Sequence, residues 1–279
     1  MNILTFDIEE WYHFDIFSKE KTWLDYPPRI NLYLPQVLDS LDEKGIKATF
    51  FCLGWIARIY PNVVREICDR GHEIACHTDK HLFVCNMTPE IFRDDLKIAI
   101  NSLENITGKK VKSFRAPAFT ITESSKWAFE VLSEFGIEND CSIFPASRSY
   151  GGFPSFKRAM PSIISYNGIN IREFPINTSR LMGQYFVYSG GGYFRLFPYW
   201  LIKLLLSRAD YAMTYLHMRD FDYQQPRFHY FTLERTFKSY YGLKNAYSKF
   251  QHLIEDFEWI NVEKATHVID WTKVPVIKL

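Results

Sequence analysis

Residues 46–76, IKATFFCLGWIARIYPNVVREICDRGHEIAC, decide the predicted fold. IKATFFCL is a short apolar run typical of a buried strand. PNVVREICDRG carries the signals of a helix that begins at Pro61 and ends at Gly71. HEIAC is then the next strand. A strand, a helix and a second strand in this order predict a βαβ unit with parallel strands.

The same alternation continues in both directions along the chain. Upstream, NILTF at residues 2–6 is a predicted strand, and a helix over residues 32–45 ends at Gly45. The downstream elements are a helix capped by Thr88 and ended by Gly108, the strand VKSFR (111–115), a helix capped by Thr122 and ended by Gly136, the strands NIREFPI (170–176) and YAMTYLH (211–217), and a helix from Leu243 to Phe257. This order predicts the α/β class, with a parallel sheet or barrel.

We predict one catalytic domain over residues 1–279. The hydrophobic fraction of 47% is ample for a sizeable core. The stretch from about 142 to 192 is irregular and rich in Gly, Ser, Pro and aromatic residues. We expect an elaborated active-site loop there rather than a linker.

Composition and charge exclude several partners. The net charge of +1 argues against nucleic acid. Five cysteines without a CxxC pair favour a reducing compartment, and the N-terminus lacks a signal peptide, so we expect a cytoplasmic protein. YFRLFPYWLIKLLL (193–206) is interrupted by Arg195, Pro198 and Lys203, which argues against a transmembrane segment. Its composition leaves open peripheral contact with a membrane or a lipid-tailed substrate.

Polar residues follow the predicted strands at their carboxyl ends, where parallel α/β folds collect their chemistry. The set comprises Asp7, Glu9 and Glu10 after the first strand, His77 and His81 after HEIAC, Arg115 after VKSFR, Asp140, and His217. Each has an ordinary structural alternative, such as a turn cap for Asp7 or a core position for His217. Their shared placement at one rim favours a site.

Such a set supports metal-assisted hydrolysis. Two histidines and one carboxylate make a three-ligand metal site with room for water and substrate. Zinc held in this way lowers the pKa of its water toward ~7 and polarises a carbonyl. A second carboxylate can accept a proton, an opposing histidine can donate one, and an arginine can keep the base ionised.

Five segments resemble, in order, the motifs of the polysaccharide deacetylases, the NodB-like carbohydrate esterases: LTFDIEEW (4–11), HEIACHTDKH (72–81), FRAPAF (114–119), ENDCSIFP (138–145) and YLHMRDFD (215–222). The resemblance implies a distorted (β/α) barrel of about seven strands. It also implies a hydrolase of carbon–nitrogen bonds that removes acetyl groups from sugars with one divalent metal ion, zinc first and nickel or cobalt as alternatives.

The resemblance also implies roles for single residues. They are Asp7 as catalytic base, His77 and His81 as metal ligands, Arg115 as the residue that orients the base, Asp140 as the partner of the acid histidine, Leu216 as a lining residue of the acetyl-methyl pocket, and His217 as the general acid.

The chain departs from the family pattern at two motifs. Ile8 stands where most members have a second, metal-binding aspartate. We therefore expect Glu9 to bind the metal, because it projects to the same side of an extended segment as Asp7. Glu10 would be turned away unless a turn follows the strand. In RAPAF, either the Ala118 or the Phe119 backbone N–H could serve the developing oxyanion.

The segment SGGGYFRLFP (189–198) has three consecutive glycines, which permit close backbone approach to a ligand. We predict that it forms one wall of the substrate cleft. Tyr193 would then face a sugar ring, and Arg195 would pair with a phosphate or carboxylate. The alternative is a flexible crossover loop.

The predicted function is metal-dependent deacetylation of an N-acetylated or O-acetylated saccharide, within cell-surface polysaccharide or lipopolysaccharide biosynthesis. A nucleotide-linked or lipid-linked saccharide is the expected substrate. Two alternatives remain: a ring-amide hydrolase acting on a cyclic imide or allantoin-like compound, and a saccharide-binding protein without turnover.

Overall fold

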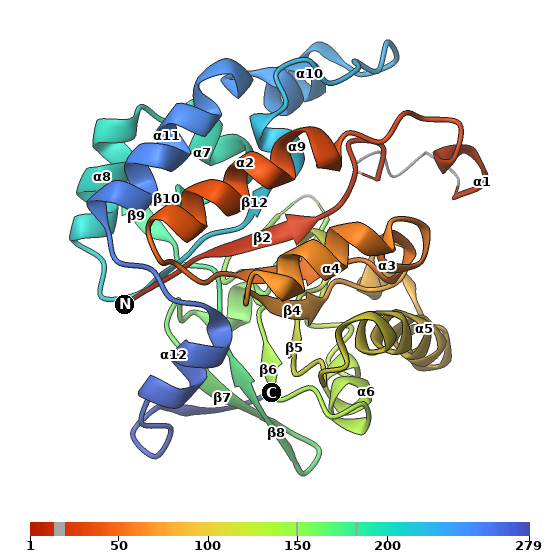
Figure 1. Ribbon diagram of the computed structural model, residues 1–279. Coiled ribbons are helices and arrows are strands. Elements are labelled where there is room, and N and C mark those ends of the chain that lie inside the picture. Colours follow the sequence, from red (N-terminus) through yellow and green to blue (C-terminus); the bar gives the residue numbers. More distant parts are fainter. Residues whose placement is uncertain (14–19, 149, 182–183) are drawn as a thin grey trace.

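The structure is a computed structural model that describes residues 1–13, 20–148, 150–181 and 184–279. Within these ranges, a run of parallel strands forms the centre of the molecule (Figure 1). In spatial order the strands of this run are β12 (Leu216–His217), β2 (Thr5–Ile8), β3 (Thr49–Cys52), β4 (Glu73–Cys76), β5 (Ser113–Phe114), β6 (Asn139–Asp140) and β8 (Ile169–Glu173). The α/β class and the distorted barrel of about seven strands are confirmed.

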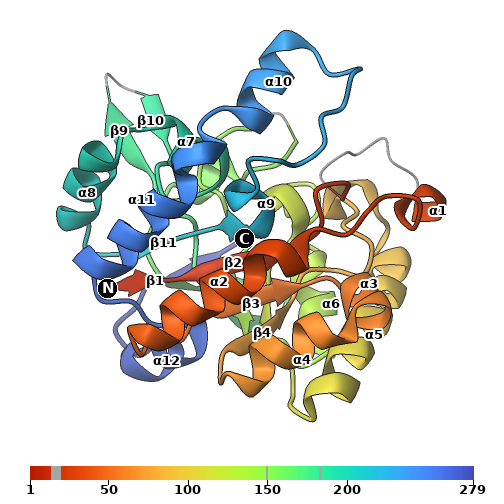
Figure 2. The ribbon, with the colours of Figure 1, turned by 45° about the horizontal axis from the view of Figure 1, so that its top comes forward.

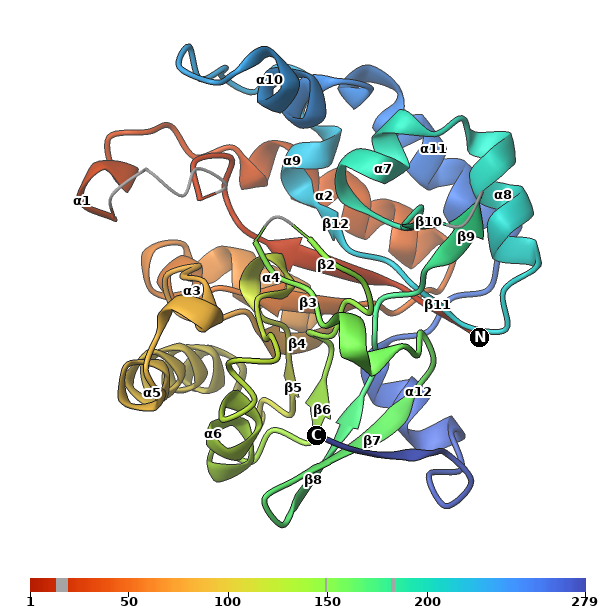
Figure 3. The ribbon, with the colours of Figure 1, turned by 180° about the vertical axis from the view of Figure 1, so that it is seen from behind.

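Beyond β8 the sheet continues with different strand directions. β7 (Ser162–Tyr166) pairs antiparallel with β8, and β13 (Val276–Lys278) lies beside β7 in parallel, as Figure 3 shows. Two short pairs stand apart from this sheet: β1 (Asn2–Ile3) with β11 (Ala212–Met213), and β9 (Ser179–Leu181) with β10 (Gln184–Phe186).

Helices surround the strands (Figure 1). They are α1 (Glu20–Trp23), α2 (Ile30–Glu43), α3 (Gly54–Ile59), α4 (Pro61–Asp69), α5 (Pro89–Thr107), α6 (Ala128–Glu134), α7 (Gly191–Leu196), α8 (Tyr199–Ser207), α9 (Met218–Phe221), α10 (Leu233–Tyr240), α11 (Leu243–Asp256) and α12 (Val262–Val268). Figure 2 shows α10 projecting above α9 at the edge of the molecule. In the described residues, no helix is long and apolar enough to cross a membrane.

Strand alternation sorts the buried side chains into two apolar clusters. Phe6 and Phe50 face outward, where their rings stack at 4.9 Å and Phe250 of α11 covers them. Phe51, next to Phe50 in the chain, belongs to the second cluster, inside the barrel, together with Ala75. Each strand therefore presents one set of side chains to the helices and the other to the interior that leads to the site.

Several predicted helix ends are confirmed. The Thr88 hydroxyl accepts a hydrogen bond from the Ile91 N–H at the start of α5, and Gly108 ends that helix with a φ of 65°. The Thr122 prediction is wrong, because α6 begins only at Ala128. Thr122 instead starts a turn in which its carbonyl accepts from the Ser125 N–H and its N–H donates to the Ser125 hydroxyl.

The stretch over 142–192 is more regular than its composition suggested. β7 and β8 form a hairpin, with Asn167 and Gly168 at its turn at φ values of 45° and 85°. Asn-Gly with positive φ at both positions is the preferred two-residue hairpin turn. The sequence SIISYNGINI contains this hairpin signal, although the Gly, Ser and Pro content of the whole region suggested a loop.

Candidate active site

The cluster best suited to a metal consists of Glu9, His77 and His81, whose ligand atoms all lie within 4.8 Å of one another. Glu9 follows β2, and both histidines follow β4. His81 Nε2 lies 2.6 Å from a Glu9 oxygen. His77 Nδ1 donates to the Arg115 carbonyl at 2.8 Å, which leaves its Nε2 as an acceptor. The three groups predicted to bind metal therefore converge.

Burial and neighbouring charges put Glu9 and His77 in the protonation states that a metal requires. Burial lowers the pKa of His77 to about 4, so its ring is neutral at pH 7. Burial would raise the pKa of the Glu9 carboxyl, but His81, His217 and His77 outweigh this and hold it below its usual range. The site thus offers an ionised carboxylate beside a neutral imidazole.

The loop between the two histidines is held in an unusual conformation. Thr78 and His81 have φ values of 68° and 55°, which non-glycine residues rarely adopt. The Thr78 and Asp79 carbonyls accept from the N–H groups of Gly54 and Trp55, and the Asp79 carboxylate binds Arg58. Because these contacts over-determine the loop, the strain persists and His81 turns back toward Glu9.

Glu10 has a different task from Glu9. Its carboxylate accepts from the N–H groups of Arg29 and Ile30, at 2.8–3.0 Å, where α2 begins. Burial raises the pKa of Glu10 to about 7, although these N–H groups act in the opposite direction. The two-residue strand period thus separated the glutamates as expected, with Glu9 beside the histidines and Glu10 at a helix end.

Asp7 is held by a fully buried arginine. Arg115 Nη1 donates to Asp7 Oδ1 at 2.6 Å, and its guanidinium lies 4.1 Å from the centre of the Phe51 ring. The Arg115 side chain has no solvent exposure and that of Asp7 has 5%. A buried arginine at this distance fixes the direction of the carboxylate.

His217 faces the same carboxylates from the neighbouring strand. Asp7 and His217 are paired in register between β2 and β12. His217 Nε2 lies 3.7 Å from Asp7 and 3.8 Å from Glu9, while its Nδ1 lies 2.9 Å from Asp220. Burial would lower the pKa of His217, but Asp220, Glu9 and Asp7 outweigh it and raise the pKa to about 9.

Known families match both halves of the chain. Residues 4–138 match the polysaccharide deacetylase family, and residues 141–267 match a domain family of unknown function, DUF3473. Over residues 4–138 the chain is therefore similar to the polysaccharide deacetylases. Asp7, Glu9, His77, His81 and Arg115 lie inside the first matched segment, whereas His217 lies in the second.

The matched relatives share part of their length with this chain. The peptidoglycan-N-acetylglucosamine deacetylase of Bacillus cereus is 34% identical over 99 residues, 35% of this chain and 36% of that protein. PdaA of Bacillus subtilis, a peptidoglycan-N-acetylmuramic acid deacetylase, is 30% identical over 87 residues, 31% of this chain and 33% of that protein. The chain thus spans about a third of the length of these curated relatives.

One solved structure resembles the whole chain. A candidate polysaccharide deacetylase from Mycobacterium smegmatis superposes with a TM-score of 0.69 at 17% identity, over 100% of this chain and 92% of that one. At this identity the likeness concerns the fold alone.

The partner of His217 differs from the expectation. Asp140 is fully buried and accepts from the Ser142 hydroxyl at 2.6 Å, close to Glu173. Asp220, which the sequence analysis did not select, holds His217 instead. The available signal was its position three residues after His217, where its carboxylate also accepts the His217 N–H and closes a capping box at α9.

Two predicted substrate contacts are buried side chains, Leu216 in the outer cluster and Phe119 in the inner one. Leu216 is fully buried in the outer cluster with Phe6, because alternation along β12 turns it away from the side of His217. Phe119 is also buried, and its N–H donates to the Ala116 carbonyl. The Phe119 ring instead packs against Tyr215 at 5.2 Å.

The glycine-rich segment is placed beside the site, but not as a wall of exposed side chains. Gly190 and Gly191 lie against the Tyr215 ring, where a Cβ would collide, and that ring lies 6.2 Å from the His217 ring. Tyr193 is 42% exposed and remains a candidate substrate contact. Arg195 is 4% exposed, and its guanidinium is bound within the protein. The glycines thus allow α7 to approach Tyr215.

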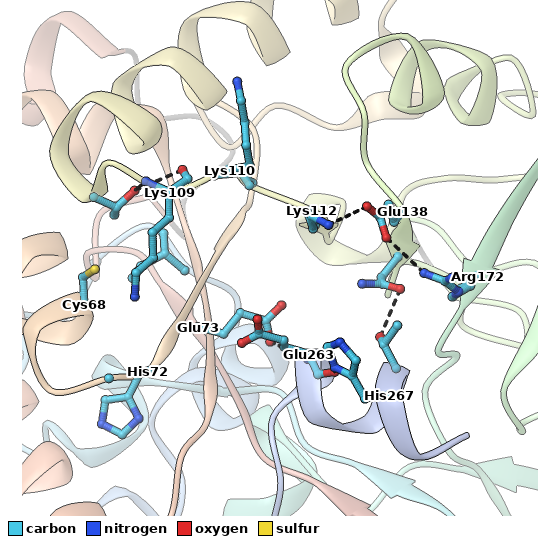
Figure 4. A pocket seen from close by; sticks show the side chains of 16 residues that line it. Cys68, His72, Glu73, Lys109, Lys110, Lys112, Glu138, Arg172, Glu263 and His267 are labelled. Atoms are coloured by element: carbon cyan, nitrogen blue, oxygen red, sulfur yellow. Dashed lines mark hydrogen bonds and ion pairs between the residues drawn. The ribbon is translucent and has the colours of Figure 1, made fainter. Parts of the chain in front are cut away.

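A hollow of about 600 Å³ lies at the amino ends of the strands, opposite the candidate active site (Figure 4). Its charged groups largely bind one another: Glu138 lies 2.8 Å from Lys112 and 3.1 Å from Arg172. Glu73 accepts from Thr49, Ser113 and the Glu263 N–H. His72 also lies at this end, away from the catalytic candidates.

Proposed function

We propose that this protein removes the acetyl group from an N-acetylated saccharide in a metal-dependent hydrolysis. The observation that carries the proposal is the placement of His217 within 4 Å of both Asp7 and Glu9, beside the Glu9, His77 and His81 cluster. Amide hydrolysis needs a base for the attacking water and an acid for the leaving nitrogen. Asp7 and His217 supply such groups at one position.

The residues fit one divalent ion. A buried carboxylate and two imidazoles converge, and His77 Nδ1 is bound so that Nε2 can act as a ligand. We propose zinc, with nickel and cobalt as alternatives, because the mixed nitrogen and oxygen donor set suits these ions. When bound, the ion would polarise the acetyl carbonyl and lower the pKa of the attacking water.

The chain's own residues then divide the proton transfers. Asp7, held by Arg115, takes the proton of the attacking water. His217 gives a proton to the saccharide nitrogen as the carbon–nitrogen bond breaks, while Asp220 holds its Nδ1–H. The Phe119 N–H is already engaged, so we assign the backbone donor for the developing oxyanion to Ala118.

We further propose a cell-surface polysaccharide or lipopolysaccharide precursor as substrate, handled in the cytoplasm by one domain over residues 1–279. All five cysteines are free, which supports a reducing compartment. A single sheet crosses both matched segments and supports one domain. Trp200 on α8 is 67% exposed and Leu204 38% exposed, which would suit contact with a lipid-linked saccharide or a membrane surface.

The test is acetate release by purified protein loaded with zinc, nickel or cobalt. The panel contains acetylated nucleotide sugars, chitooligosaccharides, peptidoglycan fragments and a lipid-linked N-acetylated saccharide, with Asp7→Asn as the control. Stoichiometric metal and acetate release that Asp7→Asn abolishes would support the proposal. Turnover of cyclic imides or allantoin alone, or saccharide binding without acetate release, would replace it by one of the two alternatives.

A further inference from the structure

Arg195 occupies a buried position behind the proposed acid. Its Nε lies 2.9 Å from Asp220 Oδ1. Nη1 donates to the Ser239 and Tyr241 carbonyls at 2.9 Å, and Nη2 donates to the Lys238 carbonyl at 3.0 Å. The guanidinium therefore joins Asp220 to the C-terminal end of α10.

Asp220 in turn lies between Arg195 and His217. Its Oδ2 accepts the His217 N–H at 3.0 Å and lies 2.9 Å from His217 Nδ1, while its Oδ1 faces Arg195. Asp220 is 2% exposed, so water cannot readily replace either partner. The contact on the Oδ1 side is an ion pair whose Nε–H is not aligned for a hydrogen bond, while the contacts on the Oδ2 side are hydrogen bonds. Together they favour one direction of this dry carboxylate.

We propose that Arg195 is a positioning residue: it fixes Asp220, and through Asp220 it aims His217 Nε2 toward Asp7 and Glu9. This inference rests on the proposed function, in which His217 protonates the leaving nitrogen. It replaces the expectation that Arg195 binds an anionic part of the substrate.

The chemistry of the arginine side chain suits this role. A guanidinium is planar and has several fixed donors, so it can bind a carboxylate and a group of carbonyls at once, which an ammonium on a flexible stem does less well. The carbonyls at the end of α10 are the negative end of that helix, where a cation is favourable. Arg195 thereby ties the orientation of Asp220 to two helices, α7 and α10.

The backbone of α7 is held by separate contacts. Lys249 Nζ donates to the carbonyls of Phe194, Arg195 and Phe197, at 3.3, 2.8 and 2.7 Å. Gly242 also lies against α7, and a Cβ added to it would be 2.5 Å from the Arg195 carbonyl oxygen. Lys249→Met is therefore a matched control: it removes a half-buried cation contact of α7 without touching Asp220.

The experiment compares Arg195→Gln with Lys249→Met in metal-loaded protein on two substrates. An N-acetylated saccharide needs an acid at its nitrogen, whereas 4-nitrophenyl acetate has a leaving group that departs without one. For Arg195→Gln we expect kcat on the saccharide to fall about 10-fold to 100-fold with KM and metal content unchanged, and 4-nitrophenyl acetate turnover to stay within about two-fold. Lys249→Met should not change the ratio of the two activities.

Equal loss on both substrates, or a rise in KM alone, would overturn the inference. If Arg195→Gln does not fold, Arg195→Lys keeps the charge and should show the same selective loss. A measurement independent of turnover is the NMR signal of the His217 Nδ1–H in metal-free protein. It should broaden or shift in Arg195→Gln and persist in Lys249→Met, and an unchanged signal in Arg195→Gln would also overturn the inference. If the wild type releases no acetate, the proposed function fails, and this signal still decides the positioning role.

Discussion

The two matched segments of the chain build the candidate site in different ways. Residues 4–138 supply the proposed base Asp7 from within β2, and the metal-ligand candidates Glu9, His77 and His81 from short segments directly after β2 and β4. Residues 141–267 supply His217, whose Nδ1 side depends on Asp220 and, behind it, Arg195. The first group lies where its strands end, while the proposed acid lies beside a buried ion pair between α7 and α9, two helices far apart in the chain. Substitutions in the two segments should therefore affect metal binding, turnover and stability differently.

The largest effect should come from loss of the metal cluster. His77→Ala should abolish both stoichiometric metal binding and turnover, because it removes one of three protein ligands. The matched variant is Glu10→Gln, which should keep the metal and change the free energy of unfolding by at most about 1 kcal/mol, because the amide oxygen can still accept from the first N–H groups of α2 and burial already penalises the carboxylate. Metal analysis and urea unfolding measure both. Metal loss in Glu10→Gln would show that the two glutamates are not divided as the structure places them.

Loss of the base should come next. Asp7→Asn should lower kcat about 10²-fold to 10⁴-fold and leave metal content near that of the wild type, because Asp7 binds Arg115 rather than the histidine pair. Steady-state kinetics with metal analysis decide this. Near-normal turnover would assign the base role to another carboxylate.

A smaller effect concerns the charge of His217 in the second segment. In metal-free protein its pKa is raised to about 9, so the stabilisation by protonated His217 is complete below pH 6.5 and is lost as the pH rises through about 9. This amounts to roughly 3 kcal/mol at most. Urea unfolding with a chelator at pH 6 and pH 10 should show a larger decrease for the wild type than for Asp220→Asn. Equal decreases would mean that Asp220 does not hold the charge.

The smallest effect should come from Leu216. Because Leu216 faces the outer cluster with Phe6, Leu216→Val should cost about 1 kcal/mol of stability and leave KM unchanged. Tyr193→Ala, at an exposed position of α7, should instead raise KM with little change in stability. A KM effect in Leu216→Val would restore its predicted role at the acetyl group.

Much of the first segment could be predicted from the sequence. The signals were local: apolar runs with Pro and Gly boundaries predicted β3, α4 and β4 within residues 46–76, although not α3, and the two-residue period separated Glu9 from Glu10. The same period could have placed Leu216 and His217 on opposite faces of β12. The family resemblance outweighed that signal in the prediction.

The second segment was harder to predict because its decisive contacts join residues far apart in the chain. Arg195 lies 25 residues before Asp220 in the chain, and the carbonyls that Arg195 binds lie about 20 residues after Asp220. Nothing in SGGGYFRLFP distinguishes an arginine that faces a ligand from one that is folded inward. The resemblance to the fourth motif also directed attention to Asp140, which is buried beside Ser142 and Glu173.

The sequence by itself determined the α/β class and the strand ends that carry Asp7, Glu9, His77, His81, Arg115 and His217. Periodicity and end signals act over a few residues, so they can be read along the chain. Only the tertiary structure decided that Asp140 does not reach His217 and that Arg195 lies behind Asp220. A buried charge needs a partner, and packing can bring that partner from a helix far away in the sequence. The sequence alone does not identify such a residue.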